Sequence, residues 1–160
     1  MEKNMKRLFF ALVLALVAGS FSFAQSADKV TQILEADEIT YGQLGYLSAC
    51  QLSLVDDSTS FVEAFTALQN AGYVGKDVSA GDKVTYKGLS GLCSRTFGIR
   101  ESLMYRITSA DRYAFKQLQS LGAVPSSADP GRTVSGYDAM SVISECIELT
   151  GQSAASEGDE

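Results

Sequence analysis

The chain has 160 residues with 13 basic side chains, 19 acidic side chains and no histidine, which gives a formal net charge of −6 at pH 7. Because nucleic acids and anionic membranes repel an acidic chain, we expect neither as a partner. The lack of histidine excludes Ser-His and Cys-His nucleophiles, and the sequence has no phosphate-binding, calcium or nucleotide motif. We therefore expect a protein without enzymatic activity or cofactor.

The N-terminus has the pattern of a secretory signal peptide in residues 1–24. Three basic residues precede the apolar run LFFALVLALVAG, and SFA at 22–24 supplies the small residues of a cleavage site. This run is too short for a membrane-spanning helix, which needs about 20 apolar residues. We predict cleavage before Gln25, release into the periplasm or the extracellular space, and no transmembrane segment in the mature chain.

Without residues 1–24 the chain has 136 residues with 10 basic and 18 acidic side chains, which is the size of a single domain. Its last segment, GQSAASEGDE at 151–160, has no large apolar side chain and ends in acids. Such a segment cannot bury enough surface to offset its ordering entropy. We therefore place the domain at residues 25–150 and predict a disordered acidic tail at 151–160.

The three cysteines are Cys50, Cys93 and Cys146. They have no CxxC spacing, and without histidine the usual zinc patterns are absent, so we predict no metal site. Export to an oxidising compartment would permit one disulfide and leave one thiol over. The alternative, which we favour, is that each cysteine is a small buried residue on a helix and stays a free thiol.

An internal repeat with a spacing of 50 residues covers much of the chain. AFTALQNAGYV at 64–74 lies over AFKQLQSLGAV at 114–124, and the same spacing aligns Val84 with Val134. A shorter third copy begins at residue 39, where ITYGQLGYLSAC is similar to VTYKGLSGLCSR at 84–95. One spacing that aligns separate segments predicts a duplicated structural unit preceded by part of a third.

Each unit is predicted to be a helix, a loop and a second helix. In the first helix, apolar residues of 61–71 follow the spacing of one buried face, with Gln69 outward, Ser60 and Glu63 as a capping box and Gly72 as the stop. In its copy, the predicted cap is Ser109 or Asp111 and the stop is Gly122.

The second helices are predicted to begin after a hydroxyl residue, namely Thr40, Thr85 or Ser135. Thr40 with Gln43 makes another capping box. When the second helices of the two full units are aligned, the sequence also permits a shift of one residue. On their apolar faces Leu89, Leu92 and Cys93 have counterparts at or near Met140, Val142 and Ile143.

These elements predict a mainly all-α fold in which pseudo-repeated helix-loop-helix units pack as one domain, with at most short strands in the loops. We place a half unit at 36–54 and full units at 57–97 and 109–149. The half unit lacks a clear leading helix, because SADKVTQIL at 26–34 is short and has no glycine stop.

The order of these features resembles the S-layer homology repeat. In that family a helix with the pattern A-I-x-x-L-x-x-x-G-I/V is followed by a glycine-rich loop and by V-T-R-A-E, which opens a second helix. Here YAFKQLQSLGAV through PGRTVSGYDAM has this order, as does EAFTALQNAGYV through GDKVTYKGL. The resemblance spans residues 39–149. It implies a cell-envelope domain of three units around a central helical cluster, which tethers proteins to cell-wall carbohydrate or peptidoglycan.

The arginine of T-R-A-E, which contacts the anionic wall polymer in that family, is absent from this chain. The corresponding segments read TYGQ at 40–43, TYKG at 85–88 and SGYD at 135–138. The resemblance therefore implies the scaffold and leaves carbohydrate binding without its motif. The residues that could replace the arginine are Tyr41, Tyr86 and Lys87.

A basic segment interrupts this acidic chain between residues 95 and 116. It contains Arg95, Arg100, Arg106, Arg112 and Lys116 against two acids, with Phe97, Tyr105 and Tyr113 among them. Guanidinium groups bind phosphates and carboxylates in two-point fashion, so this segment could hold an anionic polymer or an acidic partner. The alternative, which we favour, is that these arginines pair with the protein's own acids.

A carboxylate pair, Glu145 and Glu148, lies three residues apart on a predicted helix, but such pairs are usually solvated. We therefore expect a scaffold or adaptor that binds another envelope protein. The alternative is a module that binds a cell-wall polymer, peptidoglycan or an anionic glycan, through the Arg95 to Lys116 segment. The candidate binding residues are Arg95, Arg100, Arg106, Arg112, Tyr105, Tyr86 and Lys87.

Overall fold

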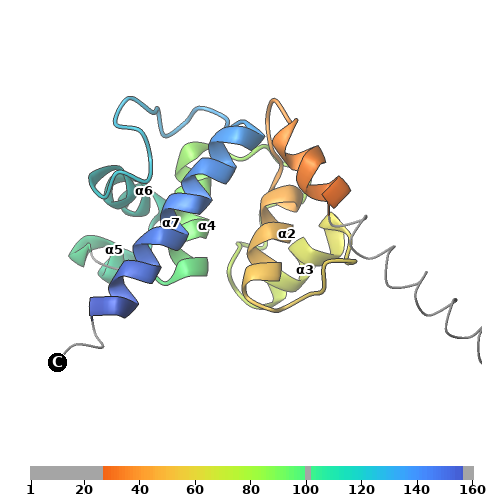
Figure 1. Cartoon of the computed structure of the whole chain (residues 1–160), viewed down its shortest axis with the longest axis horizontal. Helices are drawn as coiled ribbons and strands as arrows, with labels where there is room; N and C mark the ends of the chain where they lie inside the picture. Colours follow the sequence, from red (N-terminus) through yellow and green to blue (C-terminus); the bar gives the residue numbers. More distant parts are fainter. Residues whose placement is uncertain (1–26, 100–101, 157–160) are drawn as a thin grey trace, which may run out of the picture.

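The computed structural model describes residues 27–99 and 102–156, and these are mainly helical, which confirms the predicted fold class (Figure 1). A helical segment at 27–34 comes first. It is followed by α2 (Tyr41–Gln51), α3 (Phe61–Asn70), α4 (Tyr86–Phe97), α5 (Leu103–Thr108), α6 (Asp111–Ser120) and α7 (Gly136–Ser156). Extended pairing within the described residues is limited to isolated bridges, Thr40 with Lys83 and Thr85 with Thr133.

Hydroxyl residues cap the N-termini of four of these helices as predicted, and Ser102 also caps α5. Thr40 at α2 and Ser60 at α3 each form a full capping box with the residue three positions later. The hydroxyls of Thr85 and Ser135 each accept a hydrogen bond from the backbone N–H three positions later, at 3.3 and 3.1 Å. These bonds satisfy N–H groups that a helix start leaves without a partner.

The predicted cap of α6 was wrong. The cap residue is Ala110, which has no side-chain hydrogen bond to the helix. Ser109 instead ends α5 in the left-handed conformation, with φ of 52°. Asp111 is the first residue of α6, and its carboxylate turns to Arg95 on α4. A tertiary ion pair has thus replaced the local cap.

The loops after α3 and α6 repeat the same structure at a spacing of 50 residues. Gly72 and Gly122 both have φ of 82°, the conformation in which glycine carries no steric penalty. Gln69 donates its amide to two carbonyls of its loop at 2.8 and 3.2 Å, and Gln119 donates to three carbonyls of the other loop at 3.1–3.4 Å. Gln69 therefore does not simply face outward as predicted, because its amide holds the loop.

The leading helices pack on helices of the preceding unit. α3 packs on α2, and α6 packs on α4, while α7 also contacts α4. In Figure 1, α4 and α7 lie in the centre, with α2 and α3 on one side and α5 and α6 on the other. Each unit thus buries its apolar faces against its neighbours, and one core runs through the segment at 27–34, α2, α3, α4, α6 and α7.

The three copies of the repeated phrase meet at one point in the core. The backbone N–H of Ile39 donates to the carbonyl of Val134 at 2.9 Å, that of Val134 donates to Val84 at 3.0 Å, and that of Val84 donates to Ile39 at 3.0 Å. All three residues are fully buried. Because each bond joins equivalent positions, they form a closed ring with approximate threefold symmetry, and α2, α4 and α7 begin directly after it.

The first residues of α2 and α4 reach across to the neighbouring central helix. The Tyr41 hydroxyl lies against Gly88 of α4, where a Cβ atom would overlap it. The Tyr86 hydroxyl donates to the Asp138 carboxylate on α7 at 3.0 Å. Gly88 and Asp138 both stand at the third position of their helices, so the two contacts are equivalent.

The first residue of α7 is Gly136, where α2 and α4 have Tyr41 and Tyr86. The N-terminal segment at 27–34 fills the space that a tyrosine side chain would occupy. A Cβ atom on Gly136 would overlap the backbone carbonyl of Ile33, and the Gly136 N–H donates to the carbonyl of Ala36 at 2.8 Å. Ile33 itself is fully buried. The segment at 27–34 thus takes the place that a third tyrosine would have.

Tertiary contacts explain why residues 27–34 are helical although the half unit was predicted without a clear leading helix. The Lys29 ammonium donates to the carbonyls of Asp57 and Thr59, both at 2.7 Å, and lies 4.8 Å from the ring centroid of Tyr46. Together with the burial of Ile33, these contacts stabilise a segment too short to be helical alone.

The register of α7 follows the spacing of 50 residues without a slip. Ala139 and Val142 are buried at the positions of Leu89 and Leu92 of α4. Met140, the other candidate for the first position, is only half-buried. The packing therefore selects one of the two alignments that the sequence left open.

The predicted disordered tail begins too early, because α7 continues to Ser156. A helix that is already nucleated gains one hydrogen bond for each residue added, so it can extend beyond its packed part. Residues 157–160 and the predicted signal peptide at 1–24 lie outside the described residues. Over the residues that the structure describes, no helix has both the length and the apolar character that crossing a membrane requires.

Candidate binding sites

Arg95, the first residue of the predicted basic site, joins two parts of the protein itself. Its guanidinium donates to the Asp111 carboxylate at 2.7 Å and to the carbonyl of Tyr73 at 2.9 Å. A Cβ atom on Gly91 would overlap that carboxylate, so the glycine makes room for the pair. Arg95 thus has the internal partner that our favoured alternative predicted for these arginines, and it links α4 to α6.

Two predicted site residues, Tyr86 and Tyr105, are buried, at 1% and 3% exposed. The Tyr86 hydroxyl donates to Asp138 and accepts a hydrogen bond from Arg132 at 3.2 Å. Burial is the largest of the effects on this phenol, and it raises the pKa of Tyr86 above its ordinary value. We predicted that Tyr86 would contact a ligand at the surface. In the structure its side chain is buried and packs across the start of α7.

The remaining predicted residues do not form a defined site. Lys87 on α4, Arg106 on α5 and Arg112 on α6 are exposed. Arg100 lies outside the described residues. The predicted set thus comprises two buried tyrosines, one internally paired arginine and exposed cations from three different helices. The exposed cations Lys87, Arg106 and Arg112 line none of the three cavities described below.

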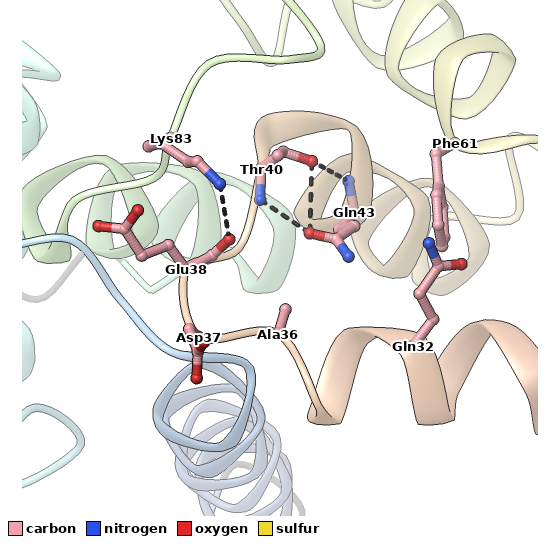
Figure 2. Close-up of a pocket in the computed structure, with 8 residues that line it drawn as sticks. All are labelled: Gln32, Ala36, Asp37, Glu38, Thr40, Gln43, Phe61 and Lys83. Atoms are coloured by element: carbon pink, nitrogen blue, oxygen red, sulfur yellow. Dashed lines mark hydrogen bonds between the residues drawn. The ribbon is translucent and has the colours of Figure 1, made fainter.

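A polar groove of about 570 Å³ opens beside the start of α2 (Figure 2). It lies between the helical segment at 27–34, the loop that leads to α2, the start of α3 and the end of the loop before α4. Figure 2 shows Gln32 and Phe61 at one end of it and Glu38 and Lys83 at the other. The lining residues are Gln32, Ala36, Asp37, Glu38, Thr40, Gln43, Phe61 and Lys83.

Several polar groups of this groove are fixed by hydrogen bonds. The Lys83 ammonium donates to the backbone carbonyl of Glu38 at 3.2 Å, and the Glu38 carboxylate accepts from the Thr133 hydroxyl at 2.6 Å. The Gln43 carbonyl accepts from the Thr40 N–H at 2.9 Å, and Figure 2 shows its amide nitrogen pointing away from Thr40. Amides, a carboxylate, an ammonium and one aromatic ring suit a polar ligand such as a saccharide.

An apolar cleft of about 200 Å³ lies between α2, α4 and α7. In Figure 1, α7 runs diagonally away from α2, so the two helices separate toward their C-terminal ends. Ile147 stands at the cleft and is 48% exposed. The lining residues are Leu47, Ser48, Gln51, Phe97, Met140, Ile143 and Ile147.

The two acids singled out on α7, Glu145 and Glu148, do not line a common cavity among those described. Glu145 lines a small cavity of about 140 Å³ with Asp138 and Ser141. Glu148 is exposed and does not line that cavity. Among the described residues, no group of three or more Cys, Asp or Glu side chains is arranged to hold a metal ion.

The polar groove and the apolar cleft were not predicted, because no sequence motif marks either of them. Residues from four separate segments line the polar groove, and the cleft depends on how far α2 and α7 separate. The available signals were Met140 and Ile147, which add apolar surface to α7 beyond its buried face. Comparison with known proteins found no matching family model, no matching curated protein and no matching solved structure.

Proposed function

We propose that this protein is a non-enzymatic adaptor of the cell envelope, periplasmic or secreted, which binds another envelope protein at the apolar cleft between α2, α4 and α7. The cleft carries the proposal because it offers aliphatic and aromatic side chains at the surface, and their burial drives association. The signal-peptide pattern and the resemblance to S-layer homology repeats support the envelope location.

The charge around the cleft indicates the chemistry of the partner. α2 has no charged residue, and α7 has three acidic residues and no basic one. Glu148 directly follows Ile147, so an acid stands beside the cleft. The expected partner segment is therefore an amphipathic helix with an aliphatic or aromatic anchor and flanking lysines or arginines.

The experiment compares two isoleucine variants as baits in native envelope extracts. Ile147→Gln removes the apolar group at the cleft, and Ile107→Gln makes the same change on α5, where the isoleucine is 70% exposed. Both positions are exposed, so both variants should unfold within about 0.5 kcal/mol of the wild type. Proteins captured by the wild type and Ile107→Gln but lost with Ile147→Gln are the candidates for binding measurements with purified components.

The proposal requires that such a protein exists and that its affinity falls at least about tenfold in Ile147→Gln, which corresponds to about 1.4 kcal/mol. Equal affinity of the two variants for the purified partner would contradict binding at the cleft. Binding should survive moderate salt, because apolar burial is not screened, although the flanking charges should weaken with it.

The second candidate function is binding of a cell-wall polymer, and the polar groove of Figure 2 is the observation that favours it. Its amides and the Phe61 ring could bind a sugar through hydroxyl groups and a C–H face, while Lys83 could meet an anionic substituent. This site differs from the Arg95 to Lys116 segment, in which Arg95 is paired with Asp111.

Retention on purified cell-wall sacculi separates the two functions. An adaptor should not be retained at any salt concentration. If the groove holds an anionic polymer, retention should fall steeply with salt, because exposed charges are screened over about 8 Å at physiological ionic strength. It should also be lost in Lys83→Gln and kept in the control Lys76→Gln, an exposed lysine of the same loop. Salt-sensitive retention that depends on Lys83 would contradict the adaptor function and support binding of a cell-wall polymer.

A further inference from the structure

Two of the three cysteines lie side by side in the core. Cys93 on α4 and Cys146 on α7 are both buried, and α4 and α7 pack against each other. The Cys146 thiol is the first cause of the raised pKa of Cys93, as expected of two neighbouring sulfur groups, and the two are not bonded to each other in the structure. The third cysteine, Cys50 on α2, is only half-buried and makes its contact with Tyr46 instead. The sequence offered three pairings, and the packing brings one of them together.

Both thiols of this pair are shielded from solvent once the protein is folded. The neighbouring thiol of Cys146, together with complete burial, raises the pKa of Cys93 well above its ordinary value. Thiol–disulfide exchange proceeds through the thiolate and needs access to the attacking sulfur. The folded reduced protein therefore holds the two sulfur atoms together and at the same time protects them from an oxidant.

The sequence favours three free thiols, and the structure has all three cysteines unbonded. We propose instead that in the native protein Cys93 and Cys146 form a structural disulfide that is made while the chain folds in an oxidising compartment, and that Cys50 stays a free thiol. This bond would join α4 to α7 and enclose the chain between them, including α5 and α6. Closing a long loop restricts the unfolded chain, so the bond stabilises the fold. The inference goes beyond the adaptor function and does not depend on it.

The chemistry requires an oxidant of the thiol–disulfide oxidoreductase class, or oxidised glutathione. One cysteine of the incompletely folded chain loses its proton, and its thiolate attacks the oxidant's disulfide and releases one oxidant thiol. The second cysteine thiolate then attacks this mixed disulfide and releases the other oxidant thiol. The two cysteines lose two electrons and two protons in total, and the oxidant's disulfide is reduced to two thiols.

The first test refolds the denatured, reduced chain in a glutathione redox buffer, which makes the result independent of export. The product is denatured without reductant, alkylated with iodoacetamide and weighed by mass spectrometry. We expect one alkylated cysteine, at Cys50, and a linked peptide pair containing Cys93 and Cys146. Three alkylated cysteines, or a bond that includes Cys50, would overturn the proposal. Cys50→Ser should give a linked protein without alkylation.

The second test measures timing. The reduced protein, already folded, is exposed to the same oxidised glutathione, and the rate of disulfide formation is compared with that of the denatured chain. We expect oxidation of the folded protein to be at least about tenfold slower, because both thiols are buried and an oxidant cannot reach them. Equal rates would refute formation during folding and would make the bond a switch of the folded protein.

The third test examines the full chain after export through its own signal into the periplasm of a bacterial host. Alkylation on lysis should find the Cys93–Cys146 bond in the wild type. Cys93→Ser should leave two alkylated cysteines and unfold at a lower denaturant concentration than the oxidised wild type. An exported wild type that carries three free thiols, while refolding in glutathione forms the bond, would refute the disulfide for the native protein.

Discussion

Replacing Gly136 with alanine should destabilise the protein, although the same change stabilises most helices. Alanine is the better helix former by up to about 1 kcal/mol. At Gly136, however, the new methyl group would overlap the Ile33 backbone carbonyl, which no side-chain rotation can relieve. Either the core shifts, which typically costs about 1–3 kcal/mol, or residues 27–34 detach and expose Ile33, which costs about 1.5–3 kcal/mol.

The control for this prediction is Gly151→Ala in the same helix, where a Cβ atom would meet no neighbour within 4 Å. We expect that variant to be unchanged or more stable, and because the propensity gain is common to both positions, the two variants should differ by about 1–3 kcal/mol. Urea unfolding with equal m-values would measure the difference. If both variants unfold at the same urea concentration, the N-terminal segment does not pack against the start of α7 as described, and the reasoning fails.

Three further outcomes follow from the repeat and the core. Phe65→Ala and Phe115→Ala, at 4% and 5% exposed, should each cost about 3–5 kcal/mol in urea unfolding, and a variant with the wild-type midpoint would show that the two sites are not equivalent. Gln69→Ala and Gln119→Ala should each cost about 0.5–1.5 kcal/mol, and a neutral result would rule out the loop-holding role. Because burial raises the pKa of Tyr86 above its ordinary value of 10, the unfolding free energy should fall as the pH rises above 10, and Tyr86→Phe should show a smaller fall.

The sequence predicted most of what depends on neighbouring residues. The capping boxes at Thr40 and Ser60 were found because a cap requires only a hydroxyl and a residue three positions later. The helix stops at Gly72 and Gly122 were found because the left-handed conformation favours glycine. The repeat supplied the all-α fold class, since one amphipathic pattern recurred at a constant spacing.

What depends on tertiary packing was not predicted. The Arg95–Asp111 pair replaced a local cap of α6 with a contact between two helices, and no spacing rule anticipates such a choice. Tyr86 was predicted at a surface site, because it stands where the S-layer homology repeat, which the sequence resembles, has its arginine. In the structure the neighbouring helix buries Tyr86. The cleft at Ile147 lies where α2 and α7 separate, and the apolar residues Met140 and Ile147 do not by themselves reveal that separation.

The most direct test of the adaptor proposal is site-specific photo-crosslinking in the native envelope. A photoreactive amino acid would be placed at position 147 in the cleft, at 83 in the polar groove and at the control position 107 on α5. The account predicts one discrete protein linked to position 147 and absent from the other two. A product at position 83 that contains cell-wall polymer, with none at 147 beyond the control, would contradict it.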